Sequence, residues 1–286
     1  MKFSSKRLID NLITAGLCIL MFILTCIFMT LLILRVGNTA IIIRNTDIKG
    51  ILYETEIAYY MESQLNGLPF NNSYITLDEI GDFIQSKAVS NEIGRIAKKY
   101  ASELSAGNLD YHITTGEVFI ASQNLAPELF DLFGHHMTEA DYRHFVRTLD
   151  DILDFRGQTI NGLLEDFGTG AVVPRVLLSP FLVWGAGILW ILSLLILCMH
   201  KKDDIKSVLL FAGVPVLLSG LIFLAAGVIT SRGPELLGDT LYRFAGFAGG
   251  IIFLTTGYGI AFSAAGVFSA AAWFIFRCID KSKNQC

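Results

Sequence analysis

The sequence predicts an all-α membrane protein with four transmembrane helices and a large α-helical extracytoplasmic domain between the first and second spans. Three observations support this fold class. Hydrophobic residues make up 53% of the 286 residues, and the mean hydropathy is +0.54. Four stretches without a charged residue are each long enough to cross a hydrocarbon layer of ~30 Å at ~1.5 Å per helical residue. The polar insert at residues 35–175 has instead the 3.6-residue apolar repeat of amphipathic helices.

The first span is predicted at residues 12–34, after a basic cytoplasmic segment at residues 1–11. Its 23 residues exceed the ~7–15-residue apolar core of a cleavable signal peptide. We therefore interpret it as an uncleaved signal anchor and keep its removal as the alternative. The three later spans are predicted at residues 176–199, 207–230 and 244–276.

The orientation follows from the basic residues in the short flanks of the spans. The amino-terminal segment, the connector at 200–206 and the tail at 277–286 each contain three Lys or Arg residues, whereas the connector at 231–243 contains two. Because Lys and Arg accumulate on the cytoplasmic side, both termini are predicted to be cytoplasmic. The insert and the 231–243 connector then lie outside, and a cysteine-free external domain favours a multi-pass protein of a bacterial plasma membrane.

Several helices are predicted inside the insert. Thr76 with Glu79 and Thr114 with Glu117 form capping boxes, in which each side chain satisfies a backbone N–H at the start of a helix. The clearest helix begins at Thr138. Its apolar positions follow a 3.6-residue period and are Tyr142, Phe145, Val146, Leu149, Ile152 and Leu153.

Other parts of the insert are less determined by their pattern. A helix is predicted near residues 49–66, with Tyr53, Ile57, Tyr60 and Met61 on one face. The short apolar patch at residues 40–44 fits either a strand or an extension of the first span. Pro127 predicts a break between two helical segments, because proline lacks the N–H that a helix interior needs.

The charge of the insert excludes one class of partner. Residues 35–176 contain 11 basic and 20 acidic residues, a balance of −9, while the rest of the chain sums to +5. Nucleic-acid binding requires a basic surface, so nucleic acid is not expected as a partner. None of the five cysteines lies in the insert, which excludes a disulfide framework and a thiolate zinc site there.

A metal site is conceivable at His135, His136, His144 and Asp141. Asp141 and His144 are three residues apart on the helix that begins at Thr138, but the side chains of the adjacent His135 and His136 diverge. Spacing alone therefore gives this site little support, and we favour solvated histidines beside a polar turn. No metal or other cofactor is predicted.

Small residues in the last span predict close helix packing. Gly257, Ala261, Ala265 and Ser269 recur every four residues, and Gly246 with Gly250 forms a G-x-x-x-G pair. Such residues let helix backbones approach in lipid, where no hydrophobic force drives the helices together. We favour packing within one protomer and keep a homo-oligomer interface as the alternative.

The predicted function is non-enzymatic: a module that displays the acidic helical domain for ligand or protein binding, in sensing or assembly. No catalytic motif is present, and the four apolar stretches contain no ionisable residue of the kind that active transporters use. The bilayer and either a protein partner or a second copy are the predicted partners. The alternatives are a channel or transporter accessory subunit, and a membrane-bound metallohydrolase using the three histidines.

Overall fold

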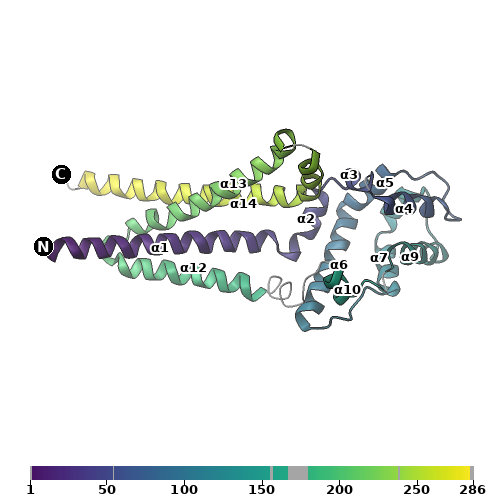
Figure 1. Cartoon of the computed structure of the whole chain (residues 1–286), viewed down its shortest axis with the longest axis horizontal. Helices are drawn as coiled ribbons and strands as arrows, with labels where there is room; N and C mark the ends of the chain where they lie inside the picture. Colours follow the sequence, from purple (N-terminus) through teal and green to yellow (C-terminus); the bar gives the residue numbers. More distant parts are fainter. Residues whose placement is uncertain (1, 54, 155–156, 167–179, 238, 284–286) are drawn as a thin grey trace. The chain divides into compact units, whose positions relative to one another are not determined.

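The computed structural model of the chain describes residues 2–53, 55–154, 157–166, 180–237 and 239–283, which form helices and turns without a strand (Figure 1). The chain divides into two compact units. The first, here called the bundle, comprises Met1–Leu34, Pro180–Arg232 and Ile252–Cys286. The second, here called the helical domain, comprises Arg35–Ser179 and Gly233–Ile251.

Four helices are long and apolar enough to cross a membrane, which confirms the predicted number of spans. They are α1 (Lys2–Ile33), α12 (Pro180–His200), α13 (Ser207–Leu237) and α14 (Asp239–Lys283). Their apolar segments are Leu8–Ile33, Phe181–His200, Ser207–Ser231 and Ala248–Asp280. Residues 176–179 of the second predicted span lie outside the described residues.

Within the connector predicted at residues 231–243, residues 231–237 and 239–243 are helical. Helix α13 extends to Leu237 and α14 begins at Asp239. Hydropathy marks where a segment stops being apolar, but a helix can continue into a polar segment because its backbone hydrogen bonds are internal. The end of a predicted span is therefore not the end of its helix.

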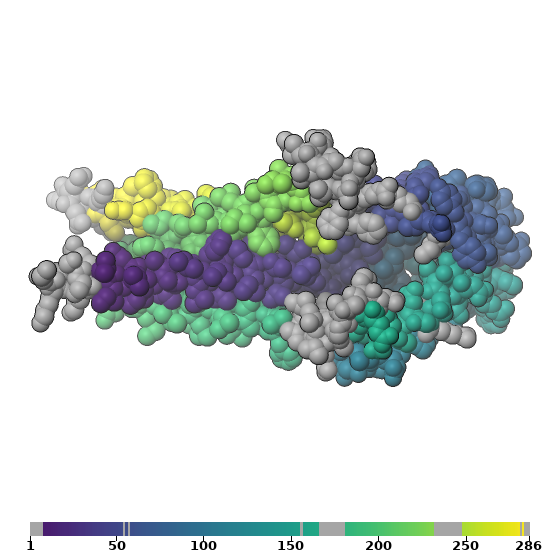
Figure 2. All heavy atoms as spheres, viewed as in Figure 1, coloured from purple at the N-terminus to yellow at the C-terminus, as the bar shows by residue number. Residues whose placement is uncertain are grey.

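Helices α1 and α12 pack side by side along the bundle (Figure 2). Met21 of α1 and Leu197 of α12 are fully buried and belong to a small apolar cluster with Val208. The indole Nε1 of Trp190 donates to the Thr25 hydroxyl at 3.0 Å. Such a bond satisfies a polar group that lipid could not solvate.

A proline in α13 is compensated by α1. Pro215 has no N–H, so it cannot bond the carbonyl of Phe211 one turn earlier. The Cys18 thiol donates to that carbonyl at 3.3 Å. The Ser219 hydroxyl, fully buried, donates to the Pro215 carbonyl at 2.8 Å. Neighbouring side chains thus allow the proline to lie inside a membrane helix.

Ion pairs join the helices at one end of the bundle. Asp10 near the start of α1 contacts His200 and Lys201 at 2.7 Å each, at the end of α12. Lys206, just before α13, contacts Asp280 near the end of α14 at 2.7 Å. The four helices therefore alternate in direction, and the start of α1 and the end of α14 lie at the same end.

The helical domain consists of short helices, and all three predicted helix starts at Thr76, Thr114 and Thr138 are confirmed as capping boxes. Leu125 separates the two helices around Pro127, which lies in the first turn of the second, where proline is tolerated. The elements are η1 (Val36–Asn38), α2 (Thr39–Arg44), α3 (Ile48–Tyr53), α4 (Glu56–Asn66), α5 (Leu77–Gln85), α6 (Lys87–Ala106), α7 (Thr115–Asn124), α8 (Ala126–Phe133), α9 (Glu139–Leu153) and α10 (Ile160–Asp166).

Two predicted elements differ from the structure. Residues 40–44 belong to α2, a helix separated from α1 by η1, and form neither a strand nor an extension of the first span. The helix predicted near 49–66 is two helices, α3 and α4, and of its predicted apolar face Tyr53 and Tyr60 are each 50% exposed. Met61 does pack against the core, as predicted, and the side chain of Ile57 lies outside the described residues. Ala58, buried at 1% exposure, faces inward instead. The break between α3 and α4 changes the helical phase, so one apolar face does not extend across both.

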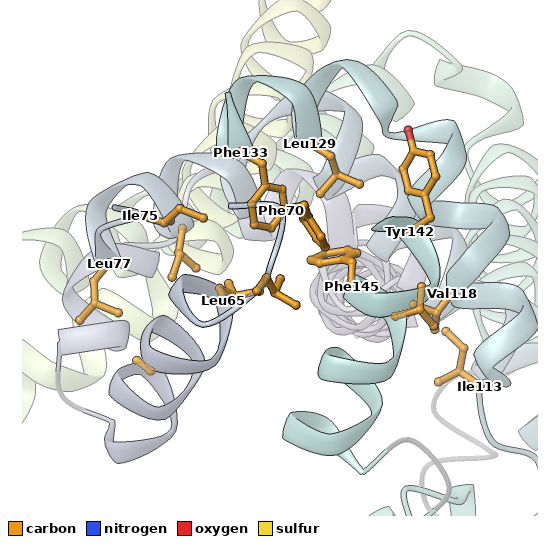
Figure 3. Close-up of a cluster of buried hydrophobic side chains, with 14 residues drawn as sticks. Leu65, Phe70, Ile75, Leu77, Ile113, Val118, Leu129, Phe133, Tyr142 and Phe145 are labelled. Atoms are coloured by element: carbon orange, nitrogen blue, oxygen red, sulfur yellow. The ribbon is translucent and has the colours of Figure 1, made fainter. Parts of the chain in front are cut away.

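The core of the helical domain is built from aliphatic and aromatic side chains (Figure 3). Phe133 and Leu129 of α8 are fully buried. The Phe133 ring makes edge-to-face contacts with Phe70 at 5.2 Å and with Phe145 of α9 at 5.7 Å between centroids. Such pairs add to the stabilisation from burying their surface. The predicted apolar stripe of α9 is confirmed at Tyr142, Phe145 and Val146, which are buried.

Candidate functional site

The helical domain contains an apolar cavity of about 450 Å³ that is partly open to solvent. Ligand pockets in proteins typically measure ~300–1,000 Å³, so this volume suits a small molecule. The cavity extends from the core cluster and is bordered by helices α4 to α10. Its apolar wall includes Ile93, Ile96, Val118, Ala121, Leu132, Leu149, Leu153 and Leu163.

Helices α6 and α9 both contribute several residues to the wall. On α6, Ile93, Ile96 and Tyr100 are three or four residues apart and therefore lie on one face. On α9, Phe145 and Leu149 continue the apolar stripe beyond its buried half. The cavity exists because these faces do not meet completely. A partly open apolar hollow of this size is the kind of site in which proteins bind small molecules.

Helix α10 borders the cavity through Leu163 and is fixed by main-chain hydrogen bonds. The Ile160 N–H donates to the Tyr111 carbonyl at 3.1 Å, and the Asn161 N–H donates to the Leu109 carbonyl at 3.0 Å. Ile160 itself is buried at 4% exposure. These bonds connect the chain that leads toward α12 to the segment before α7.

The polar residues that line the cavity are few and have partners within the chain. Ser122 is buried and donates to the Phe119 carbonyl at 2.8 Å. The Tyr100 hydroxyl accepts from the Ile113 N–H at 2.9 Å. The Gln158 side-chain amide donates to the Leu153 carbonyl at 2.9 Å.

Glu92 is the only charged residue among the described residues of the lining. Its carboxylate Oε1 accepts hydrogen bonds from Nε and Nη2 of Arg95, at 2.9 and 2.6 Å. The Glu92 side chain is 14% exposed, whereas that of Arg95 is 51% exposed. Glu92 is thus the more buried partner and contributes to the cavity wall, whereas Arg95 is more exposed and is not part of the wall.

A polar cluster adjoins the tyrosine side of the cavity. Lys99 forms an ion pair with Glu117 and lies 5.2 Å from the centre of the Tyr111 ring, which packs edge-to-face against Tyr100. Burial alone would raise the pKa of Glu117. The hydrogen bonds from Lys99 and from the backbone and hydroxyl of Thr114 outweigh that effect and lower the pKa to about 2. Glu117 therefore stays ionised and fixes the start of α7.

The histidines weighed as candidate metal ligands do not converge in the structure. The described residues contain no group of three His, Cys, Asp or Glu side chains placed to hold an ion. His136 stacks on Phe130 with 4.4 Å between ring centroids, and His135 packs against Phe70. His144 is exposed on α9.

Asp141, the fourth candidate ligand, is part of the capping box of α9. The Thr138 N–H donates to its Oδ2 at 2.7 Å, and this bond lowers the pKa of Asp141. The Asp141 carboxylate therefore stabilises the start of α9. The spacing that suggested a ligand arises from the requirements of a helix start.

The small residues predicted for packing in α14 fall on different faces. Gly257, Ala261 and Ala265 are exposed in the single chain, and no atom lies within 4 Å of the Cβ position of Gly257. Ser269 does reach α13, where its hydroxyl donates to the Leu209 carbonyl at 2.6 Å.

The predicted pair Gly246 and Gly250 lies in the part of α14 that belongs to the helical domain. A Cβ at Gly250 would collide with the backbone of Ile42 in α2, so Gly250 is a point of close helix contact. The side-chain surroundings of Gly246 lie outside the described residues. The predicted G-x-x-x-G thus provides one described contact, and its partner is α2.

The glycines at the contact between α13 and α14 were not predicted from the sequence. Gly213, Gly220 and Gly227 recur every seven residues on α13, and a Cβ at any of them would collide with α14. Gly259 and Gly266 of α14 contact the backbone of α13 in return. The seven-residue spacing was visible in the sequence, but a four-residue repeat drew attention to another face of α14.

No protein-family model matches the chain, and neither a curated protein nor a solved structure matches it. The cavity and its polar border are therefore the basis for assigning a function.

Proposed function

We propose that the helical domain is a binding module that takes the apolar part of a small molecule into its cavity. The observation that supports this proposal is a hollow of about 450 Å³ with an almost entirely apolar wall. An empty apolar cavity destabilises a fold, because its wall atoms lose contacts that an occupant would restore. Binding of an apolar molecule therefore stabilises the domain, which is the physical basis for a sensor.

The four-span bundle anchors this domain, and we propose that it does so on the outer side of a bacterial plasma membrane. Support comes from the basic residues near the start of α1 and the end of α14, which lie at the same end of the bundle. The acidic insert emerges from the opposite end of α1. The bilayer would then supply apolar ligands directly. The module is non-enzymatic in this proposal and acts in sensing or assembly.

Photolabelling tests the binding proposal on the full chain. The protein is placed in nanodiscs with an alkane that carries a diazirine and no polar head, irradiated, and digested for mass spectrometry. We expect labelled peptides from α6, α7 and α9, and loss of that label when an excess of unlabelled alkane is added. Labels confined to α1, α12, α13 and α14 would refute the proposal.

A matched pair of variants makes this test specific to the cavity. Ala121 lies in the cavity wall and Ala140 is exposed on α9. Ala121→Trp fills the cavity and should abolish labelling of the domain, whereas Ala140→Trp should leave it unchanged. Circular dichroism and protease resistance must show that both variants remain folded.

Cysteine labelling tests the proposed orientation. In a background without the five native cysteines, single cysteines replace Ser105, Ser231 or Ser282. A membrane-impermeant maleimide added to intact cells should label positions 105 and 231 and should not label position 282. The opposite pattern would place the helical domain in the cytoplasm.

A further inference from the structure

The polar border of the cavity determines which head group its ligand can have; this inference rests on the binding function proposed above. The hydrogen-bond donors of Ser122, Tyr100 and Gln158 are directed to carbonyl groups of the chain. The hydroxyls of Ser122 and Tyr100 each donate their single proton to a carbonyl of the chain. A ligand atom that needs to accept a hydrogen bond finds few donors on this wall.

Acceptors, in contrast, remain available. Arg95 directs both of its described hydrogen bonds to Oε1 of Glu92. Oε2 of Glu92 accepts no hydrogen bond from the described residues, whereas the Gln158 amide is exposed and can both donate and accept. A carboxylate oxygen is a strong acceptor and binds charged donors most tightly. Oε2 of Glu92 can therefore accept a hydrogen bond from a ligand group that donates.

Charge favours the same choice. Glu92 is the charged residue of the described lining, and residues 35–176 have a balance of −9. An anionic head group would be repelled by Glu92 and would lose hydration without enough donors to replace it. Arg95 has N–H groups that Glu92 does not use, but its side chain is 51% exposed and is not part of the cavity wall.

We infer that the cavity binds a single-chain amphiphile whose head group donates hydrogen bonds, an alkylamine above all, with the ammonium group on Oε2 of Glu92. The alkyl chain lies against Ile96, Val118 and Leu149. A long-chain alcohol binds in the same place with a weaker head-group contact. A fatty acid of equal length is disfavoured.

Competition against the head-free diazirine alkane tests this selectivity. The full chain is placed in nanodiscs of zwitterionic lipid, and dodecylamine, dodecanol and dodecanoate are titrated, with each probe's partition into empty nanodiscs measured separately. We expect the order of potency amine, alcohol, carboxylate. Equal potency of the three, or a preference for dodecanoate, would overturn the inference while the binding function stands. No displacement by any of them, together with no label in the domain, would refute the binding function itself.

Two substitutions identify the residue responsible. Glu92→Gln keeps the shape and removes the charge, and it should lower the potency ratio of amine to carboxylate by about tenfold, as expected for loss of a charged hydrogen bond. Glu103→Gln on the same helix, outside the lining, should leave that ratio unchanged. Arg95→Gln should strengthen the preference for the amine. A loss of dodecanoate binding in Arg95→Gln, with no change in Glu92→Gln, would assign the head group to Arg95 and contradict the inference.

Discussion

The helical domain and the bundle are both all-helical, yet their helices are held together by opposite kinds of residue. In the domain, large side chains such as Phe133, Phe145 and Leu129 fill the space between helices. In the bundle, Gly213, Gly220 and Gly227 bring the backbones of α13 and α14 into direct contact.

The two solvents explain this difference. Water drives apolar side chains together, so a domain in water is stabilised in proportion to the apolar surface that it buries. Lipid provides no such force, and helices in it associate through close packing and hydrogen bonds instead. A substitution should therefore have opposite consequences in the two units: enlarging a residue damages the bundle, and shrinking a residue damages the domain.

The largest effect is expected from enlarging a bundle glycine. In Gly220→Leu the new side chain collides with the backbone and hydroxyl of Ser263, which belong to a helix and cannot move away. The cost should exceed the ~1–3 kcal/mol typical of overpacking, so α13 and α14 should separate. Resistance to unfolding by dodecyl sulfate measures this.

Gly257→Leu is the control, because no atom of another helix among the described residues lies within 4 Å of its Cβ position. It should unfold like the wild type. If it instead changes the oligomeric state, the exposed small-residue face of α14 joins two copies.

The matching substitution in the helical domain shrinks a core residue. Phe133 is fully buried and contacts two other aromatic rings. Phe133→Ala should lower the free energy of unfolding of the domain by ~3–5 kcal/mol. Pulse proteolysis in urea measures it. Tyr59→Ala, at a residue that is 55% exposed, should change stability little, and an equal loss in both variants would show that the core is not at Phe133.

Acid should weaken the domain through Glu117. Its pKa is about 2 in the folded chain against an ordinary value of 4.5. Because the folded pKa is lower, the stabilisation is fully present above the ordinary value and is lost as the pH falls toward about 2. The difference corresponds to at most about 3 kcal/mol.

Unfolding of the domain measured between neutral and strongly acidic pH tests this dependence. Glu117→Gln should be less stable at neutral pH and should lose less stability on acidification, whereas Glu128→Gln should follow the wild type. A wild-type stability that is constant down to a pH of about 2 would contradict the role of the Lys99–Glu117 pair.

The smallest effect is expected from enlarging a residue that lines the cavity of the domain. At the cavity a larger residue should help, because space is available. Ala121→Leu should raise the stability of the domain by about 1 kcal/mol while reducing ligand binding. Ala140→Leu on the exposed face of α9 is the control. Destabilisation by Ala121→Leu would mean that the cavity wall cannot accommodate the added atoms.

Sequence patterns predicted the local structure of the domain well. The capping boxes at Thr76, Thr114 and Thr138 required only residues three positions apart, and such short-range chemistry does not depend on the rest of the fold. The stripe at Phe145 and Leu149 was also predicted from its spacing. That spacing could not distinguish a residue that fills the core from one that borders a cavity.

The residues of the candidate site were harder to predict from the sequence. Glu92 and Gln158 belong to no motif, and only the fold places them beside Ile96 and Leu149. The histidines attracted attention because their residue type can bind metals, but their neighbours are aromatic rings and turns. Residue type indicates what a side chain can do, whereas a site requires several of them to converge.

The sequence by itself determined the four apolar spans, the acidic charge of the insert and the starts of its helices, because hydropathy, charge and capping depend on composition and neighbouring residues. Only the tertiary structure decided which face of α14 packs on α13 and where the domain leaves a cavity. Both depend on how residues far apart in the sequence meet. A few degrees or one residue of rotation moves a glycine from an interface to the surface, and the same rotation opens or closes the space between two apolar faces.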